Sequence, residues 1–314
     1  MNVVHKAQEL AMAGRPVCAA IGVFDGVHIG HQEVIRQTLA DARATGGLAV
    51  VITFDCHPNS IVAPQRNPPL IYSIAKKLEV LASLGLDATL LLHFDRAFSR
   101  QTGEEFAIGL ARDFKRLEGL FVGADFTFGY RRSGNLALLR QLGRELGFAV
   151  HEIVPVTQGS HVISSTLIRK SIRAGDFAAA SRQLGRPYSL CGNVVRGDQL
   201  GRQMGFPTAN LGVNGLALPP NGVYVAQALH QERRYSAVVN IGLRPTLDHP
   251  VPKLQVEAHL LGFKGDLYGA GLELFFVSKL RDERKFPSRD SLGAQISRDI
   301  AAAENILREL DPEP

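Results

Sequence analysis

Two histidines three residues apart, His28 and His31, follow a short apolar run and stand among closely spaced glycines. The full string reads Gly22-Val23-Phe24-Asp25-Gly26-Val27-His28-Ile29-Gly30-His31. Residues three apart share a face of a helix, and two imidazoles at a helix start can donate hydrogen bonds to phosphate oxygens. Glycines let the backbone and a ligand approach closely. This setting favours phosphate chemistry, although the two histidines taken alone would be better interpreted as a surface or metal-binding pair.

The second half of the chain contains another set of residues suited to ATP chemistry. Gly197, Gly201 and Gly205 punctuate a polar segment that ends in the tetrapeptide Pro-Thr-Ala-Asn. Glycine-rich loops can place backbone N–H groups around phosphates. Thr208 and Asn210 lie two apart, so on an extended segment their oxygens point to one side, where they can hold Mg²⁺ together with ATP. Each feature alone is typical of ordinary turns and caps.

Glu257 is the one carboxylate in an otherwise apolar, strand-like run. A strand-borne acid that faces a ligand can accept the proton of an attacking hydroxyl. Without further support, a solvent-facing strand residue is the simpler interpretation. The GxxxxGK[ST] sequence of P-loop kinases does not occur in the chain, so a kinase of that class is excluded.

The elements that must position the histidine pair alternate between apolar runs and amphipathic helices. Apolar runs bounded by turn residues predict strands at 17–24, 48–54, 88–93, 120–122 and 149–154. Helical spacing and capping residues predict five helices. One begins at Ser73 and has Leu78, Leu81 and Leu84 on its apolar face. The others lie at 30–45, from Thr102 to about 117, through 138–142, and at 176–184. Such an alternation is typical of a parallel sheet covered on both faces.

The pattern changes after Gly185-Arg186-Pro187, because proline cannot continue the preceding helix. Short β-like runs separated by Gly, Pro and Asn follow at 189–195, 222–229, 235–241, 254–261 and 272–277. A helical pattern returns only after Ser288, with Leu292, Ile296 and Ile300 on one face. We therefore predict an α/β domain at residues 1–185 and, at 186–314, a small antiparallel β-barrel with a terminal helix.

Composition bounds the class of protein. A chain of 314 residues is long enough for about two domains, and its three cysteines stand at wide, unpatterned spacings that argue against a disulfide framework or zinc site and suit a reducing compartment. The N-terminus lacks the apolar core of a signal peptide, and no run approaches the ~18 apolar residues of a membrane span, so we expect a cytoplasmic protein without membrane contact. The net charge of +5 is spread without a basic stripe, which argues against a nucleic-acid partner.

The histidine string carries the HxGH signature of nucleotidylyltransferases and resembles the N-terminal, FMN-adenylylating half of bacterial bifunctional riboflavin kinase/FAD synthetases. The segment 163–169 resembles the second motif of that family, the segment 123–129 resembles one near its nucleotide and flavin, and the segment 53–58 resembles a further element on its flavin side. The resemblance implies a Rossmann-like domain in which His28, His31 and Arg169 are catalytic. It also implies nucleotide binding by Gly22, Phe24, Asp25, Gly26, Ser165 and Thr166, and flavin binding by Asp125 and Phe128.

The segment 192–210 closely resembles the riboflavin kinase domain of the same family, including its Pro-Thr-Ala-Asn motif, and the segments 218–224, 240–246, 256–261 and 281–286 continue the match. The resemblance implies that Glu257 is the general base and that Thr208 and Asn210 hold Mg²⁺. It further implies that the three glycines of the loop bind ATP and that Arg281, in a loop over the flavin, binds flavin.

The resemblance spans about residues 17–300 and implies two reactions. The C-terminal domain would phosphorylate riboflavin to FMN with one ATP and Mg²⁺, and the N-terminal domain would join FMN to the adenylyl group of a second ATP, giving FAD and pyrophosphate. Riboflavin, FMN and ATP are then the expected partners, and weak association of identical chains stays open. Two alternatives remain: adenylylation of another phosphate, such as phosphopantetheine, or a barrel that binds oligonucleotides, as the isoelectric point of about 9.2 would allow.

Overall fold

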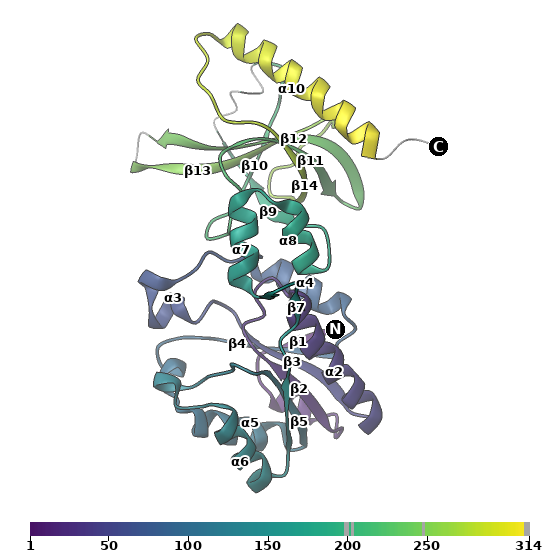
Figure 1. The fold of residues 1–314 in the computed structure, drawn as a ribbon, viewed down its shortest axis with the longest axis vertical. Helices are drawn as coiled ribbons and strands as arrows, with labels where there is room; N and C mark the ends of the chain where they lie inside the picture. The colour runs from purple at the N-terminus through teal and green to yellow at the C-terminus, as the bar shows by residue number, and fades with distance from the viewer. Residues whose placement is uncertain (198–200, 202–203, 247–248, 311–314) are drawn as a thin grey trace. The chain divides into compact units, whose positions relative to one another are not determined.

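The computed structural model describes residues 1–197, 201, 204–246 and 249–310, and it divides into two compact units, Met1–Ser165 and Thr166–Pro314 (Figure 1). Helices α7 (Ser165–Ala174) and α8 (Phe177–Leu184), which the sequence places in the first domain, group with the barrel. The boundary of the two functional domains at residue 185 stays a prediction.

A six-stranded sheet forms the first unit, with every neighbouring pair parallel, as predicted. Its strands are β1 (Asn2–Val4), β2 (Val17–Ile21), β3 (Leu48–Phe54), β4 (Ala88–Leu92), β5 (Leu117–Gly123) and β6 (Ala149–Ile153). The order is β1-β4-β3-β2-β5-β6. The chain moves outward from β2 through β3 and β4 and then returns to β5, so the crevice at the carboxyl ends of β2 and β5 is the expected ligand position.

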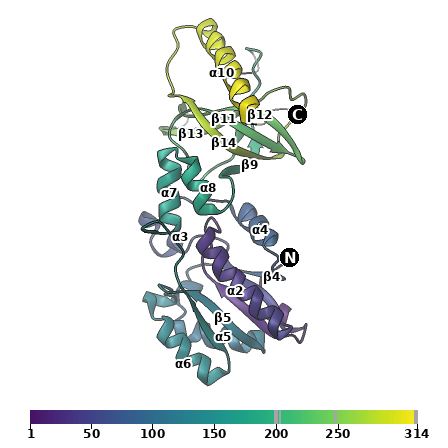
Figure 2. The same ribbon diagram turned by 45° about the vertical axis from the view of Figure 1, so that its right-hand side comes forward.

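Helices cover both faces of this sheet; Figure 2 shows α2 along one face and α5 and α6 on the other. The helices are α1 (Gln8–Ala11), α2 (Ile29–Thr45), α3 (Asn59–Val62), α4 (Ile74–Ser83), α5 (Gly103–Phe114) and α6 (Leu136–Leu146). Single-turn 3₁₀ helices lie at Pro64–Arg66, Phe98–Arg100 and Tyr130–Arg132, and β7 (Thr157–Gln158) pairs with β8 (His161–Val162).

Capping residues set the helix starts as predicted. Ser73 caps α4 by accepting from the backbone N–H of Lys76, and Thr102 forms a capping box with Glu105 at the start of α5. Helix α5 ends three residues earlier than predicted, because Lys115 adopts a positive φ of 61°.

The predicted apolar face of α4 is wrong in part. Of its three leucines only Leu81 is buried, and the buried set also contains Lys76, Lys77 and Val80. The leucine spacing could not reveal that the helix buries two lysines.

The second unit is built on a closed six-stranded barrel with the order β10-β13-β12-β11-β14-β9, in which all neighbours are antiparallel. The strands are β9 (Ser189–Val195), β10 (Ala209–Leu211), β11 (Gly222–His230), β12 (Arg233–Thr246), β13 (His249–Leu260) and β14 (Gly271–Arg281), followed by α10 (Arg289–Leu310). The predicted barrel and terminal helix are therefore confirmed. Helix α8 is part of this unit because Phe177 packs within an aromatic cluster with Tyr188, Tyr224 and Phe276.

No helix among the described residues has the length and apolar character needed to cross a membrane.

Candidate active sites

The histidine pair lies at the N-terminus of α2, just beyond the carboxyl end of β2. His28 is the N-cap residue, and its Nδ1 accepts a hydrogen bond from the backbone N–H of His31 at 3.3 Å. The two rings stack with centroids 3.6 Å apart. Gly30 makes room for this arrangement, because a Cβ there would come within 3.1 Å of the His28 ring. The pair is thus preformed beside the positive end of a helix dipole.

The loop between β2 and α2 has an unusual backbone. Phe24, Gly26 and Val27 adopt positive φ angles of 52°, 81° and 41°. A Cβ at Gly26 would also lie 2.8 Å from Cδ1 of Ile71, so a larger residue there would be strained and would displace that side chain. Non-glycine residues in this region are strained, and such strain is held in place by the surroundings.

Asp25 supplies part of that support. Its side chain is buried, and Oδ1 accepts a hydrogen bond from the backbone N–H of Ile71 at 2.9 Å. Its backbone carbonyl accepts from the hydroxyl of Ser165, also at 2.9 Å. Ser165 therefore lies against the histidine-bearing loop, and its binding of the nucleotide stays a prediction. Thr166 and Arg169 lie on α7 in the second unit, and their contact with the nucleotide stays a prediction.

An aromatic cavity of about 750 Å³ opens at the carboxyl ends of the strands, next to Gly22. Phe128 lies in its wall and stacks on Phe126, with centroids 5.2 Å apart. Asp125, the other predicted flavin residue, is exposed and does not line this cavity. The wall includes six phenylalanines in all: Phe54, Phe94, Phe98, Phe106, Phe126 and Phe128. A cavity of this size and lining suits a planar aromatic ring system.

Three glycines hold the Phe128 segment against the start of α5. A Cβ at Gly129 would lie 2.3 Å from the backbone nitrogen of Gly103, and one at Gly134 would lie 2.6 Å from the Phe128 ring. Arg131 and Arg132, which lie between Gly129 and Gly134 in the sequence, adopt positive φ angles and line the cavity.

Sequence reasoning missed several residues of this wall, among them Arg96, Arg100, Arg131 and Arg132. The available signal was position: Phe94 and Arg96 directly follow β4, whose carboxyl end lies at the same edge of the sheet as that of β2.

A second cavity, of about 380 Å³, lies in the barrel unit and contains Glu257. In the barrel register Glu257 stands between Asn210 of β10 and Asn240 of β12. The hydroxyl of Thr208 lies 3.5 Å from its Oε2, at the limit of a hydrogen bond. The structure therefore brings Thr208, Asn210 and Glu257 together. Their hydroxyl, amide and carboxylate oxygens are the hard donors that Mg²⁺ prefers.

The three loop glycines differ in their surroundings. A Cβ at Gly197 would lie 2.3 Å from the side-chain amide of Asn210, so this glycine packs directly on a predicted metal ligand. Gly201 lines the cavity, and Gly205 is exposed with a φ of 84°. The intervening residues 198–200 and 202–203 of the predicted ATP loop lie outside the described residues, as do 247 and 248.

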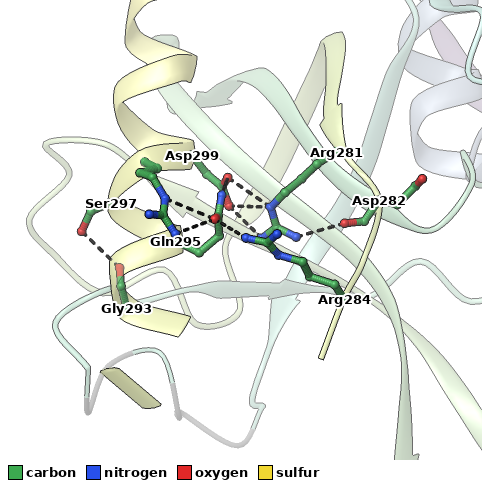
Figure 3. Close-up of polar contacts among 8 residues, drawn as sticks. Arg281, Asp282, Arg284, Gly293, Gln295, Ser297 and Asp299 are labelled. Atoms are coloured by element: carbon green, nitrogen blue, oxygen red, sulfur yellow. Dashed lines mark hydrogen bonds and ion pairs between the residues drawn. The ribbon is translucent and has the colours of Figure 1, made fainter. Parts of the chain in front are cut away.

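Helix α10, the end of β14 and the residues that follow it also line this cavity. Arg281 lines the cavity and makes a bidentate ion pair with Asp299 of α10, with its Nη2 2.8 Å and its Nε 3.0 Å from Oδ2 (Figure 3). Gln295 donates to Oδ1 of Asp299 at 2.7 Å. Leu292 and Ile296, predicted to share one face of the terminal helix, are only partly buried and line the cavity.

A neighbouring cavity of about 530 Å³ shares Thr208 with the first one. Its lining includes Phe263, Lys264, Asp266 and Tyr268. Thr208 therefore stands between a cavity that contains Glu257 and one that contains Lys264, which suits transfer of a group from one bound molecule to another.

Two family models match the chain in succession: FAD synthetase over residues 11–167 and riboflavin kinase over residues 184–307. Curated relatives named bifunctional riboflavin kinase/FMN adenylyltransferase match nearly its whole length. The relative from Escherichia coli K12 is 36% identical over 309 residues, covering 98% of both chains. The relative from Pseudomonas fluorescens is 35% identical over 303 residues, covering 96% of this chain and 97% of its own.

A solved structure from Streptococcus pneumoniae, titled a macrolide-efflux protein, has the same fold. It is 29% identical, with a TM-score of 0.79, and the match covers 96% of this chain and 98% of that one. The efflux in that title is a statement about that protein alone.

Proposed function

The chain belongs to the family of bifunctional riboflavin kinase/FMN adenylyltransferases, and we propose which of its residues carry each reaction. It phosphorylates riboflavin to FMN and adenylylates FMN to FAD, using ATP in both steps. The finer assignments below, including two separate ATP sites, Mg²⁺ and the division at residue 185, are proposals.

For the kinase reaction, the supporting observation is Glu257 beside Thr208 in a cavity lined by both apolar and charged side chains. The isoalloxazine ring would lie against Phe206, Phe286 and Leu292, with the ribityl 5′-hydroxyl directed at Glu257. Glu257 accepts the proton of the hydroxyl as the hydroxyl oxygen attacks the γ-phosphorus of ATP, and ADP leaves. ATP would occupy the adjoining cavity, where the ammonium of Lys264 can pair with phosphate oxygens.

Thr208 and Asn210 would hold Mg²⁺ against the phosphates, with the glycines of the loop close by. Bound there, the ion neutralises charge on the phosphate oxygens. The chain itself contributes the orientation of its oxygens: Asn210 is fixed in β10 by pairing with β9 and β13, and Gly197 packs on its amide.

For the adenylyl transfer, the supporting observation is the stacked histidine pair next to an aromatic cavity. The ring of FMN would lie among the phenylalanines of this cavity. Arg281 would instead contact the flavin that is bound at the kinase site. A phosphate oxygen of FMN attacks the α-phosphorus of ATP, a new P–O–P linkage forms, and pyrophosphate leaves. His28, His31 and the N-terminus of α2 stabilise the charge that grows on the α-phosphate. Ser165, Thr166 and Arg169 would hold the triphosphate, and no covalent enzyme intermediate is required.

Two variants test the assignment of one reaction to each domain. Glu257→Gln keeps a partner for Thr208 but cannot accept the proton, so FMN formation from riboflavin should stop while FMN is still converted to FAD. His28→Asn keeps an N-cap acceptor but loses the imidazole, so the opposite result is expected. Products are separated by chromatography after incubation with Mg-ATP. Loss of both steps from either variant in a folded protein would overturn the assignment of sites to domains.

A further inference from the structure

Lys77 of α4 is a buried lysine with three well-placed acceptors. Its side chain lies in the interior of the first unit, with 5% of the residue exposed. Its Nζ donates to the backbone carbonyl of Phe54 at 2.9 Å, to the hydroxyl of Thr53 at 3.0 Å and to the backbone carbonyl of Val23 at 3.3 Å. An ammonium has three N–H donors, and each is matched here. Lysine is seldom buried at all, and almost never without such partners, so the burial of Lys77 indicates a specific role.

The electrostatic setting is equally specific. Burial lowers the pKa of Lys77 to about 8, while the charges of Asp25, Asp55 and Cys56 oppose that shift. At neutral pH the group is therefore mostly an ammonium.

The three acceptors belong to two segments, one of which leads to the histidine pair proposed to bind the nucleotide. Val23 begins the loop that leads through the strained residues to His28, whereas Thr53 and Phe54 end β3. Val23 and Phe54 both line the aromatic cavity. Thr53 strengthens the link, because its hydroxyl donates to the same Val23 carbonyl at 3.0 Å.

We propose that Lys77 is a positioning residue for FMN adenylylation, which ties the histidine-bearing loop to the end of β3 and so fixes the nucleotide site relative to the flavin cavity. This inference rests on the proposed function of that site. A reacting phosphate misplaced by about 1 Å loses roughly 100-fold in rate. One side chain that joins both substrate walls is therefore well placed to control the rate without touching either substrate.

The test uses the full-length chain, in which riboflavin kinase activity reports that the second unit is intact. Lys77→Met keeps an unbranched side chain, one atom shorter, and removes the cation; kcat for FMN adenylylation should fall at least tenfold, with kinase activity within about twofold. Thr53→Val removes one acceptor and should give a smaller loss. In the Lys77→Met background Thr53→Val should add little, because both act through one link. Thr89→Val, the same change at a buried threonine of β4, is the matched control and should leave kcat unchanged.

A pH profile separates positioning from a merely structural role. Above about pH 8 the ammonium loses one of its three donors, so wild-type kcat for adenylylation should decline, and the Lys77→Met profile should lack this decline. Unchanged kcat in Lys77→Met, independent losses in the double variant, an equal loss in Thr89→Val, or the same alkaline decline in Lys77→Met would each overturn the proposal. If Lys77→Met does not fold, the Thr53→Val variant tests the proposal, and an unchanged kcat in that variant would overturn it. If instead His28→Asn retains full adenylylation, the proposed site itself is wrong, which is a separate outcome.

Discussion

The ion pair between Arg281 and Asp299 should control both the stability of the barrel unit and its affinity for riboflavin. Asp299 is 6% exposed and receives three hydrogen bonds of 2.8–3.1 Å from Arg281 and one from Gln295. Asp299→Asn removes the charge and leaves a single acceptor oxygen opposite a guanidinium whose side chain is 19% exposed. Breaking a pair of this kind costs about 3 kcal/mol, and the partial exposure of Arg281 reduces this to about 2–3 kcal/mol.

The functional effect follows from position, because both residues line the Glu257 cavity and the pair joins the end of β14 to α10 (Figure 3). With the pair broken, the wall that carries Leu292 and Ile296 is no longer held, and the KM for riboflavin should rise about tenfold, equivalent to about 1.4 kcal/mol.

Urea unfolding and kinase kinetics measure the two effects, and FMN adenylylation serves as the internal control. Ser297→Ala on the same helix is the matched variant, because the Ser297 hydroxyl bonds only to the Gly293 carbonyl among the contacts drawn in Figure 3 and faces solvent. A wild-type KM in Asp299→Asn would show that the pair does not hold the cavity wall, and an equal loss in Ser297→Ala would show that the effect is not specific to it.

Three further predictions concern the first unit. Gly26→Ala should destabilise the loop by at least about 1–2 kcal/mol, because of its left-handed backbone and the contact with Ile71, and should reduce FMN adenylylation but not kinase activity in parallel assays. Thr102→Ala should lower the free energy of unfolding by about 1 kcal/mol in urea, through loss of the capping box, with both activities retained. The pKa of Lys77 is about 8 in the folded protein against an ordinary 10.5, so the unfolded chain binds more protons between these values. The free energy of unfolding should therefore rise, by up to about 3 kcal/mol, as pH increases from 8 to 10.5, and Lys77→Met should lack this rise in pH-dependent denaturation.

Local chemistry explains which parts of this fold the sequence could predict. Ser73 and Thr102 cap helices through hydrogen bonds to residues three positions on, and Gly46 ends α2 in a left-handed conformation, so a short window contains the whole signal. Strand β1 escaped prediction because three residues are too few to show a period. The histidine loop could be recognised for the same reason, because its glycines, its positive φ angles and its helix start all lie within ten residues.

Residues whose role depends on distant segments could not be found in this way. Lys77 looks like an ordinary surface lysine of an amphipathic helix, and only the approach of Val23, Thr53 and Phe54 gives it a buried position with three acceptors. The cavity arginines are similar, because Arg96 follows β4 and Arg131 follows β5, and the parallel sheet order alone brings them to one edge.

Some apolar residues that periodicity places on one face of a helix are left partly exposed by the fold, and they line a cavity. Leu292 and Ile296 repeat with helical spacing, yet they face a cavity, while Ala303 and Leu307 of the same helix are fully packed. Phe128 behaves alike in the first unit, half-buried against Phe126. Leaving such side chains in water forgoes about 25 cal/mol for each Å² that burial would remove. A flavin ring bound at these surfaces, as proposed above, would recover that free energy, so the surface that weakens the empty protein would strengthen its complex with flavin.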